Sequence, residues 1–332
     1  MGNWRTAQRY AQMLRASGIN ATVFEPHQID DACEPLGGRL VAVALNARRS
    51  SLEIARFKAE GIPTLVVLTG TDLYGALDPN QRGSKTYQEA EAALLSADQV
   101  LTLQNQAMAE VIERWPELAL RTRCILQTAA PRASSAPRIT KNSKTVRFLI
   151  AAHIRAEKDP VTAFHAFHRA FPDGWAVRPD GRRVPVRLIH VGGHKDKMLA
   201  DELIRLGSQY SGILLEGPLS HAETLRLMTH VHAMLQPSIS EGGALVVPEA
   251  VACALPVIAS RIPAHLGQLG PSYPGLFEVG SVDSLAQAMT RFVSDAEFQA
   301  SLYDATLSLA AVLASPAHER SELVKLIREL AE

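Results

Sequence analysis

Residues 233–259 have the sequence AMLQPSISEGGALVVPEAVACALPVIA, and this stretch decides the fold class. Ala233–Gln236 is short and apolar, which favours a buried strand. Residues 244–254 carry apolar side chains at helical spacing, and residues 256–259 form a second apolar run. A strand, a helix and a strand in this order predict a β-α-β unit, whose two strands are parallel and whose crossover is right-handed.

The same alternation continues on both sides of this unit. Short apolar runs predict strands at residues 21–24, 40–45, 64–69, 99–103, 146–151, 186–191, 213–215 and 276–278. Helical spacing predicts helices at residues 6–16, 52–59, 89–95, 159–171, 197–206, 222–228, 282–293 and 296–313. Ser50 precedes one of these helices and is expected to cap it. We therefore predict an α/β protein with doubly wound parallel sheets.

A polar, Pro- and Ser-rich stretch at residues 131–145 interrupts the alternation and predicts a linker. The length of 332 residues fits about two domains. We expect an N-terminal domain over residues 1–140 and a C-terminal domain over residues 145–315, with a site in the cleft between them. A last helix at 321–330, within the segment 316–332, is expected to pack back on the first domain.

Composition excludes several classes of protein. Hydrophobic residues make up 47% and charged residues 20%, which argues against disorder. The 34 basic and 34 acidic residues give a net charge of zero, which argues against a general nucleic-acid binder. No apolar run reaches about 18 residues, and the start lacks the apolar core of a secretion signal, so we expect a cytoplasmic protein without a membrane span. Cys33, Cys124 and Cys253 are far apart and form no CxxC pair, so neither a disulfide framework nor a zinc site is expected.

The loop after strand 233–236 is the most informative candidate site. Gly242 and Gly243 permit close backbone approach to a ligand, and the N-terminus of the following helix suits a phosphate. Glu241 and Glu249 stand on either side and are candidates to bind sugar hydroxyls. The simpler alternative is a helix cap next to a solvated glutamate.

Loops after other strands supply further candidates. Arg155 and Lys158 follow strand 146–151 and can both reach a diphosphate, although a pair of solvated cations is the alternative. Gly192 follows strand 186–191 in a turn that resembles those facing nucleotides, although a plain tight turn is the alternative. The stretch 215–219 ends another strand and can offer backbone groups to a base.

The N-terminal domain shows a group of cations. Arg5 precedes the first helix, and Arg48 and Arg49 follow strand 40–45. Thr69 follows the next strand, so these four side chains are expected on one rim, facing a small anionic substrate. Templates for other catalysts are missing: the chain has no G-x-S-x-G elbow, no Walker A loop and no H-E-x-x-H. It also has no Asp-x-Asp, so neither a metal nor a cofactor is expected.

These segments resemble the retaining GT-B glycosyltransferases of family 4. The marks are Glu241 with Glu249, Arg155 with Lys158, and Pro-Val-Ile-Ala-Ser at 256–260. Narrower details look like the selenosugar synthases of selenoneine biosynthesis. These details are Gly-Asn-Trp-Arg-Thr-Ala at 2–7, Ala-Arg-Arg-Ser at 47–50, Glu-Lys-Asp-Pro at 157–160, Glu-Gly-Gly-Ala at 241–244, Ser-Arg-Ile-Pro at 260–263, and Leu-Gly at 269–270 with Tyr-Pro-Gly at 273–275. That family joins selenophosphate to the sugar of UDP-GlcNAc or UDP-glucose and forms a carbon–selenium bond.

The resemblance implies a role for each matching residue. The catalytic residues would be Glu241, which positions the sugar, and Arg155 and Lys158, which hold the diphosphate. The remaining UDP-sugar contacts would be Gly192, Gly217, Leu219, Gly242, Gly243, Ala244, Leu245 and Glu249, the last on the ribose. The selenophosphate contacts would be Asn3, Arg5, Thr6, Asn46, Arg48, Arg49 and Thr69. It also implies functional links to an enzyme that makes selenophosphate and to the selenoneine synthase.

Two departures from that family stand out. It usually has His where Asn46 stands, and Asn cannot act as a base. It also has a strand and a Gly-rich loop ahead of residues 2–5, so we expect a start shortened by a central strand, a defective first domain, and a gain in solubility and activity on restoring an upstream apolar segment.

Two other functions stay open. One is an ordinary family 4 glycosyltransferase with a hydroxyl acceptor, and the other is a non-catalytic nucleotide-sugar binding module. Three arginines around one loop rim favour a phosphate-bearing acceptor over a sugar hydroxyl.

Overall fold

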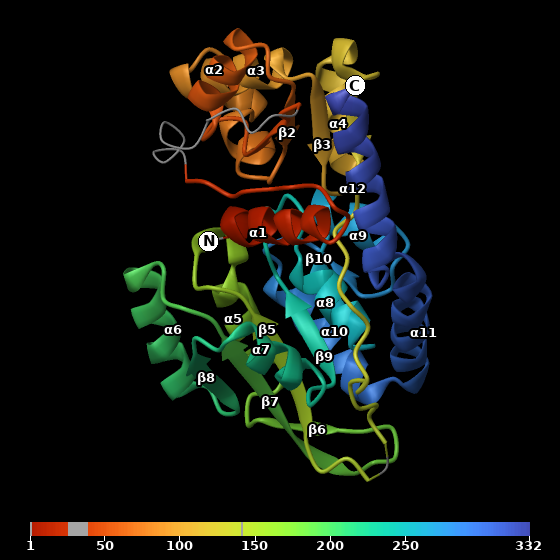
Figure 1. The fold of residues 1–332 in the computed structure, drawn as a ribbon. Coiled ribbons are helices and arrows are strands. Elements are labelled where there is room, and N and C mark those ends of the chain that lie inside the picture. The colour runs from red at the N-terminus through yellow and green to blue at the C-terminus, as the bar shows by residue number, and fades with distance from the viewer. Residues whose placement is uncertain (1, 26–38, 141) are drawn as a thin grey trace. The chain divides into compact units, whose positions relative to one another are not determined.

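The computed structural model describes residues 2–25, 39–140 and 142–332 (Figure 1). The expectation that Cys33 forms no disulfide therefore lies outside the described residues. The chain divides into two compact units. The first comprises Met1–Gln127, Glu241–Gly243 and Pro316–Glu332, and the second comprises Thr128–Ser240 and Ala244–Ser315.

The first unit is built on a four-stranded parallel sheet in which each strand pairs with the next along the chain. The strands are β1 (Ala42–Leu45), β2 (Thr64–Val67), β3 (Gln99–Thr102) and β4 (Thr122–Cys124). The helices between them are α2 (Ser51–Ala59), α3 (Lys85–Ser96) and α4 (Asn105–Arg114), with short helical turns at Asp72–Ala76, Pro79–Gln81 and Pro116–Leu118. Because every right-handed crossover steps in the same direction, these three helices are expected on the same face of the sheet.

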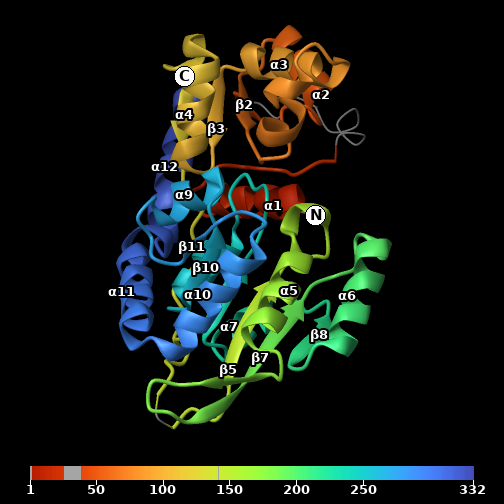
Figure 2. The same ribbon diagram turned by 180° about the vertical axis from the view of Figure 1, so that it is seen from behind.

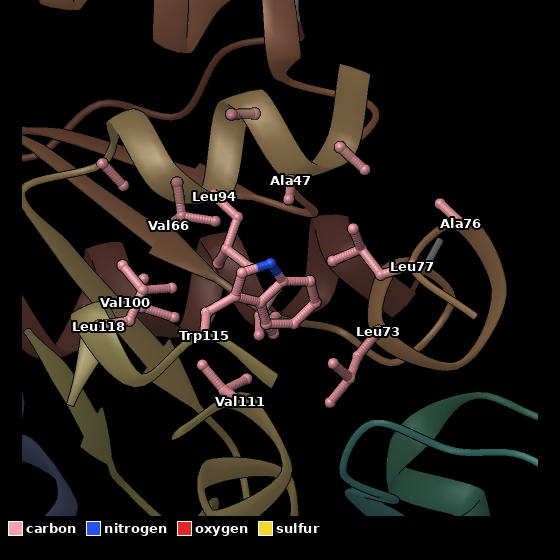
Figure 3. Close-up of a cluster of buried hydrophobic side chains, with 14 of the residues drawn as sticks. Ala47, Val66, Leu73, Ala76, Leu77, Leu94, Val100, Val111, Trp115 and Leu118 are labelled. Carbon is pink, nitrogen blue, oxygen red and sulfur yellow. The ribbon is translucent and has the colours of Figure 1, made fainter. Parts of the chain in front are cut away.

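The core under these helices is one contiguous apolar cluster. Figure 3 shows the Trp115 indole among Val66 from β2, Leu94 from α3 and Val111 from α4. The indole is buried, and its Nε1–H donates to Glu91 Oε1 at 2.9 Å, which satisfies its polar atom. This cluster packs α2, α3 and α4 against one face of the sheet.

The opposite face is covered by the two ends of the chain. Helices α1 (Gly2–Arg15) and α12 (Pro316–Ala331) pack against each other, and a second apolar cluster joins them to the sheet. In β2, Leu65 and Val67 belong to this cluster, whereas Val66 belongs to the first. Successive strand residues point to opposite faces, which explains why the run is apolar throughout.

The second unit contains a larger sheet in the order β11-β10-β9-β5-β7, with β6 and β8 on β7. Its strands are β5 (Val146–Ala151), β6 (Trp175–Val177), β7 (Arg183–Val191), β8 (Ile213–Gly217), β9 (Ala233–Gln236), β10 (Val257–Ser260) and β11 (Leu276–Phe277). All pairings are parallel except that of β6 with β7. The chain winds outward from β5 to β8 and then returns to β9 on the other side, so this sheet is doubly wound as predicted.

Helices cover both faces of this sheet. They are α5 (Pro160–Ala170), α6 (Lys197–Gln209), α7 (His221–Met228), α8 (Val246–Ala252), α9 (Pro263–Leu269), α10 (Val282–Ser294) and α11 (Ala296–Leu313). The opposite views of Figures 1 and 2 show α7 and α8 on one face and α5 and α10 on the other. In the part of the chain that is described, no helix combines the length and apolar character needed to cross a membrane.

Several predicted elements agree with the structure to the residue, and others do not. The bounds of β5, β9 and α11 are those expected. The strand expected at 21–24 is wrong: these residues pair with no strand, and the Ala21 carbonyl instead accepts from Arg15 Nε at 2.7 Å. A short run needs a partner strand to be stable. Apolar periodicity does not predict α4, β4, β6 or α9, of which β4 and β6 are only three residues long.

Two local expectations also need correction. The Ser50 side chain does not cap α2; its Oγ donates to the Leu45 carbonyl at 3.3 Å. The stretch 131–140 has no helix or strand, as its composition predicts, but it is bound to the second unit. The Arg132 and Ala136 N–H groups donate to the carbonyls of Ala252 and Cys253 at 3.0 and 2.7 Å.

The contact between α1 and α12 generates a stability prediction. Glu319 is buried on α12 and forms an ion pair with Arg9 of α1. Glu319→Ala removes the buried carboxylate of this ion pair, and we expect it to lower the free energy of unfolding by about 3–5 kcal/mol in chemical denaturation. The matched control is Glu329→Ala, since the exposed Glu329 lies 3.9 Å from Lys325 on the same helix and should contribute less than about 0.5 kcal/mol. Equal effects of the two substitutions would contradict the role given to Glu319.

Candidate functional site

The loop after β5 carries the predicted cations of the second unit. Arg155 precedes a short helical turn at Ala156–Lys158, so the two cationic side chains stand at the two ends of one turn. The Arg155 guanidinium is half-exposed, and its Nη1 lies 3.5 Å from Glu157 Oε1. Asp159 follows in a left-handed conformation and accepts from the Thr162 N–H, which starts α5. Local turn chemistry thus places Arg155 and Lys158 at the carboxyl edge of the sheet.

Glycines tie the loops after β5, β7 and β8 together. A side chain at Gly192 would lie 1.9 Å from the Ala152 carbonyl oxygen, so only glycine fits there. The Gly192 N–H donates to the Gly217 carbonyl at 2.8 Å. The next N–H, of Gly193, donates to His153 Nδ1 at 2.9 Å. Leu219, two residues beyond β8, is exposed at 37%.

Glu249 has a partner that the sequence analysis missed. It lies in α8, is 7% exposed, and its Oε1 is 2.7 Å from His221 Nε2. His221 is the first residue of α7, whose start is set by a capping box between Ser220 and Glu223. The Ser-x-x-Glu spacing after β8 was the signal available in the sequence, because it places His221 at the helix start beside the carboxyl edge.

The glycine-rich loop differs from the expected phosphate cradle. The helix predicted to begin at residue 244 begins at Val246 instead. The buried amide of Gln268 in α9 binds the Ala244 backbone twice, accepting from its N–H and donating to its carbonyl, both at 3.3 Å. The Ala244 N–H is therefore already bonded in this structure. Leu245 adopts helical angles directly before α8, with no side-chain cap.

Glu241–Gly243 belongs to the first unit, where its glycines permit close contact. A Cβ on Gly242 would lie 2.2 Å from the Thr69 carbonyl carbon. A Cβ on Gly243 would lie 2.8 Å from Leu103 Cβ. These two glycines thus let the backbone approach the loops after β2 and β3.

In the first unit, Asn46 joins two loops. It is 2% exposed and has the left-handed φ of 80° that Asn tolerates better than most residues. Its Nδ2 donates to Thr69 Oγ1 at 3.0 Å and to Thr71 Oγ1 at 2.9 Å. Its Oδ1 accepts from the Arg49 N–H at 3.0 Å. The structure therefore brings together three of the predicted acceptor residues, Asn46, Arg49 and Thr69.

The remaining predicted acceptor residues are Arg48, next to Arg49 in the loop after β1, and Asn3, Arg5 and Thr6 on α1. The Arg48 and Arg49 side chains are exposed. Asn3, Arg5 and Thr6 do not precede the first helix as expected, because α1 already begins at Gly2. Arg5 is exposed on that helix, whereas Thr6 is buried and its Oγ1 accepts from Gln127 Nε2 at 3.4 Å.

Solved structures of several differently named proteins have the same fold. The sucrose-phosphate synthase of Thermosynechococcus elongatus has a TM-score of 0.69 and 17% identity, covering 92% of this chain and 77% of that one. The Anabaena protein HepE, in complex with UDP-glucose, has a TM-score of 0.71 and 14% identity over 96% and 88% of the two chains. The UDP-forming α,α-trehalose-phosphate synthase of Burkholderia xenovorans has a TM-score of 0.71 and 14% identity over 97% and 79%.

These similarities confirm the expected fold class, GT-B, with its two Rossmann-like units of parallel sheet and helices. The family follows from the sequence itself. Residues 132–307, more than half of the chain, match the family model named glycosyl transferases group 1. The chain belongs to this family of glycosyltransferases.

Proposed function

We propose that this glycosyltransferase transfers the sugar of UDP-GlcNAc or UDP-glucose to selenophosphate, yielding a selenosugar and UDP. The observation that carries the proposal is the adjacent arginine pair, Arg48 and Arg49, exposed on a loop braced by Asn46. A phosphate-bearing acceptor needs such cations, because guanidinium groups bind phosphate oxygens in two-pronged fashion. The resemblance to selenosugar synthases is the reason for proposing selenophosphate, rather than another phosphate, as the acceptor.

In this proposal the donor is held by residues of the loops that follow β5, β7, β8 and β9, and by Glu249 of α8. HepE is described in complex with UDP-glucose, and this chain has its fold. Arg155 and Lys158 bind the diphosphate and stabilise the charge that develops on the leaving UDP. Glu249 accepts hydrogen bonds from the ribose hydroxyls, and Glu241 positions the sugar. Backbone groups at the glycine-bearing turns complete the contacts, at Gly192, Gly217, Leu219, Gly242, Gly243 and Leu245.

The acceptor is held by the first unit. Arg5, Arg48 and Arg49 bind the phosphate oxygens of selenophosphate and present its selenium to the anomeric carbon. The remaining contacts come from Asn3, Thr6, Asn46 and Thr69. The carbon–selenium bond forms as the bond between the anomeric carbon and the UDP oxygen breaks, and the electron pair leaves with UDP. Selenophosphate is already an anionic nucleophile, so a strong general base is unnecessary and Asn46 suffices where related enzymes have His.

The product then needs a second reaction. Hydrolysis of its phosphorus–selenium bond by water releases inorganic phosphate and a selenol. The chemistry also implies a supplier and a consumer: an enzyme that makes selenophosphate, and a selenoneine synthase that uses the selenosugar.

A second candidate is transfer to a hydroxyl acceptor. Two proteins of the same fold are named sucrose-phosphate synthase and trehalose-phosphate synthase, and these names describe phosphorylated sugars as products. A phosphorylated sugar would use the same arginine pair. A non-catalytic nucleotide-sugar binding module is the third possibility, since binding alone uses the same donor residues.

Measurement of released UDP distinguishes these three functions. The full chain is incubated with UDP-GlcNAc or UDP-glucose, and UDP is measured after addition of selenophosphate, glucose 6-phosphate, fructose 6-phosphate or buffer. We expect UDP only with selenophosphate. UDP with a sugar phosphate alone would support the hydroxyl acceptor, and no UDP in any arm would support a binding module; both results contradict the proposal.

The arginine pair can be tested with matched substitutions. Arg48→Ala and Arg49→Ala each remove a charged donor, so we expect the KM for selenophosphate to rise roughly 10- to 100-fold with little change in the KM for the UDP-sugar. Arg56→Ala is the control, because Arg56 is an exposed arginine on the adjoining α2, paired with Glu60 at 2.9 Å. If both variants saturate with selenophosphate as the wild type does, the anion site lies elsewhere.

The His221–Glu249 contact generates a prediction for the donor. Loss of a hydrogen bond to a charged group typically costs roughly 10-fold or more, so His221→Ala should raise the KM for the UDP-sugar and leave kcat nearly unchanged. His221→Gln should restore part of the affinity. The control is His230→Ala, which removes an exposed imidazole bonded only to nearby atoms at the end of α7. Unchanged donor binding in His221→Ala would show that Glu249 needs no such partner.

A further inference from the structure

A buried carboxylate, that of Asp72, is hydrogen-bonded to the loop that carries the arginine pair. Asp72 has no exposed surface. Its Oδ1 accepts from three N–H groups of its own loop, those of Thr69, Gly70 and Leu73, at 2.9, 2.8 and 3.1 Å. Its Oδ2 accepts from the N–H of Ala47, in the loop after β1, at 3.0 Å. One side chain thus joins the loops that follow two neighbouring strands.

The energetics favour a fixed geometry. Burial raises the pKa of the Asp72 carboxyl, and the backbone N–H donors around it oppose that rise by favouring the charged form. A buried carboxylate without such donors would be costly, so any motion of the loop after β1 away from Asp72 loses a charge-assisted hydrogen bond. The position of the loop after β1 therefore depends on Asp72 Oδ2.

Asn46 adds a second connection between the same two loops. Its Nδ2 reaches Thr69 and Thr71, and its Oδ1 holds the Arg49 N–H. Ala47 and Arg49 lie on either side of Arg48 in the sequence, so the N–H groups of both of its neighbours are held by buried side chains. The backbone that carries Arg48 has little freedom to move.

We propose that Asp72 is a positioning residue for the acceptor: its Oδ2, through the Ala47 N–H, sets where Arg48 and Arg49 meet the anionic substrate. The inference rests on the proposed function, because it names the residue that holds the proposed selenophosphate contacts in place. Asp72 itself is buried and does not touch the substrate.

The geometry allows a selective substitution. Asp72→Asn retains one carbonyl oxygen, which can keep the three bonds within its own loop, and places an amide NH₂ opposite the Ala47 N–H. Two donors then face each other, so the variant removes the Asp72–Ala47 connection and leaves the bonds of Asn46 to Thr69 and Thr71 in place. We expect hydrogen exchange at the Ala47 amide to accelerate, while the amides within β2 stay protected.

The kinetic test uses the full chain and a matched aspartate. Misplacement of a substrate contact by about 1 Å can lower the rate of an enzyme roughly 100-fold. We therefore expect Asp72→Asn to raise the KM for selenophosphate roughly 10- to 100-fold. The KM for the UDP-sugar should stay within about twofold of the wild-type value. Asp98→Asn is the control. Asp98 Oδ2 accepts from the Thr64 N–H at 2.9 Å, at the other end of β2. This control should lower the melting temperature without changing the KM for selenophosphate.

The outcomes separate this inference from the proposed function. A wild type that releases no UDP with selenophosphate overturns both. An active wild type whose Asp72→Asn variant keeps the wild-type KM for selenophosphate, or whose Asp98→Asn variant loses affinity equally, overturns only the role of Asp72. Should Asp72→Asn fail to fold, Thr71→Val provides the test. It removes a hydroxyl acceptor of Asn46 at an exposed position and should raise the same KM about 2- to 5-fold; no change would contradict the coupling of the loops.

Discussion

Parallel strand pairing is the constraint on which the rest of this structure depends. Because parallel neighbours end at the same edge of a sheet, every loop that follows a strand opens on that edge. In the first unit, this edge carries the loops after β1 and β2, with Asn46 and Thr69 hydrogen-bonded across them. In the second, it carries the loops after β5, β7 and β8, joined at Gly192. Residues far apart in sequence are thereby brought to one edge of each sheet.

Buried polar side chains then give each loop a definite shape. An unsatisfied buried polar group costs free energy, so such groups appear where they bind backbone atoms. Asp72 binds four backbone N–H groups, and Gln268 binds both the N–H and the carbonyl of Ala244. Neither residue was a candidate from the sequence. Both bind the backbone next to candidate site residues, so these loop positions are held by buried neighbours.

The sequence predicted the fold well where apolar periodicity is strong. The runs that became β5, β9 and α11 were located to the residue, because burial on one or both faces leaves a clear pattern. The isolated run at 21–24 has that pattern but no partner strand, and pairing cannot be read from one segment.

The site was predicted less completely for a physical reason. Loop positions such as Arg155 and Asn46 follow from their place after a strand. Partners such as His221 for Glu249, or Asp72 for Ala47, lie 25 to 28 residues away and depend on the register of folded strands. The start of α8 was misplaced because nothing local signals that Gln268 holds the Ala244 backbone.

The family fixes the type of reaction, transfer of a glycosyl group, and leaves the nucleophile as the central question. The proposed answer is selenium, supported by the arginine pair and by the resemblance of the motifs that carry it. The most direct measurement is the structure of the product formed from selenophosphate and a UDP-sugar labelled with ¹³C at the anomeric carbon. We expect a selenium-containing sugar by mass spectrometry, with coupling between ⁷⁷Se and the labelled carbon by nuclear magnetic resonance. A labelled product in which the anomeric carbon is bonded to oxygen, with all selenium left as selenophosphate, would contradict it.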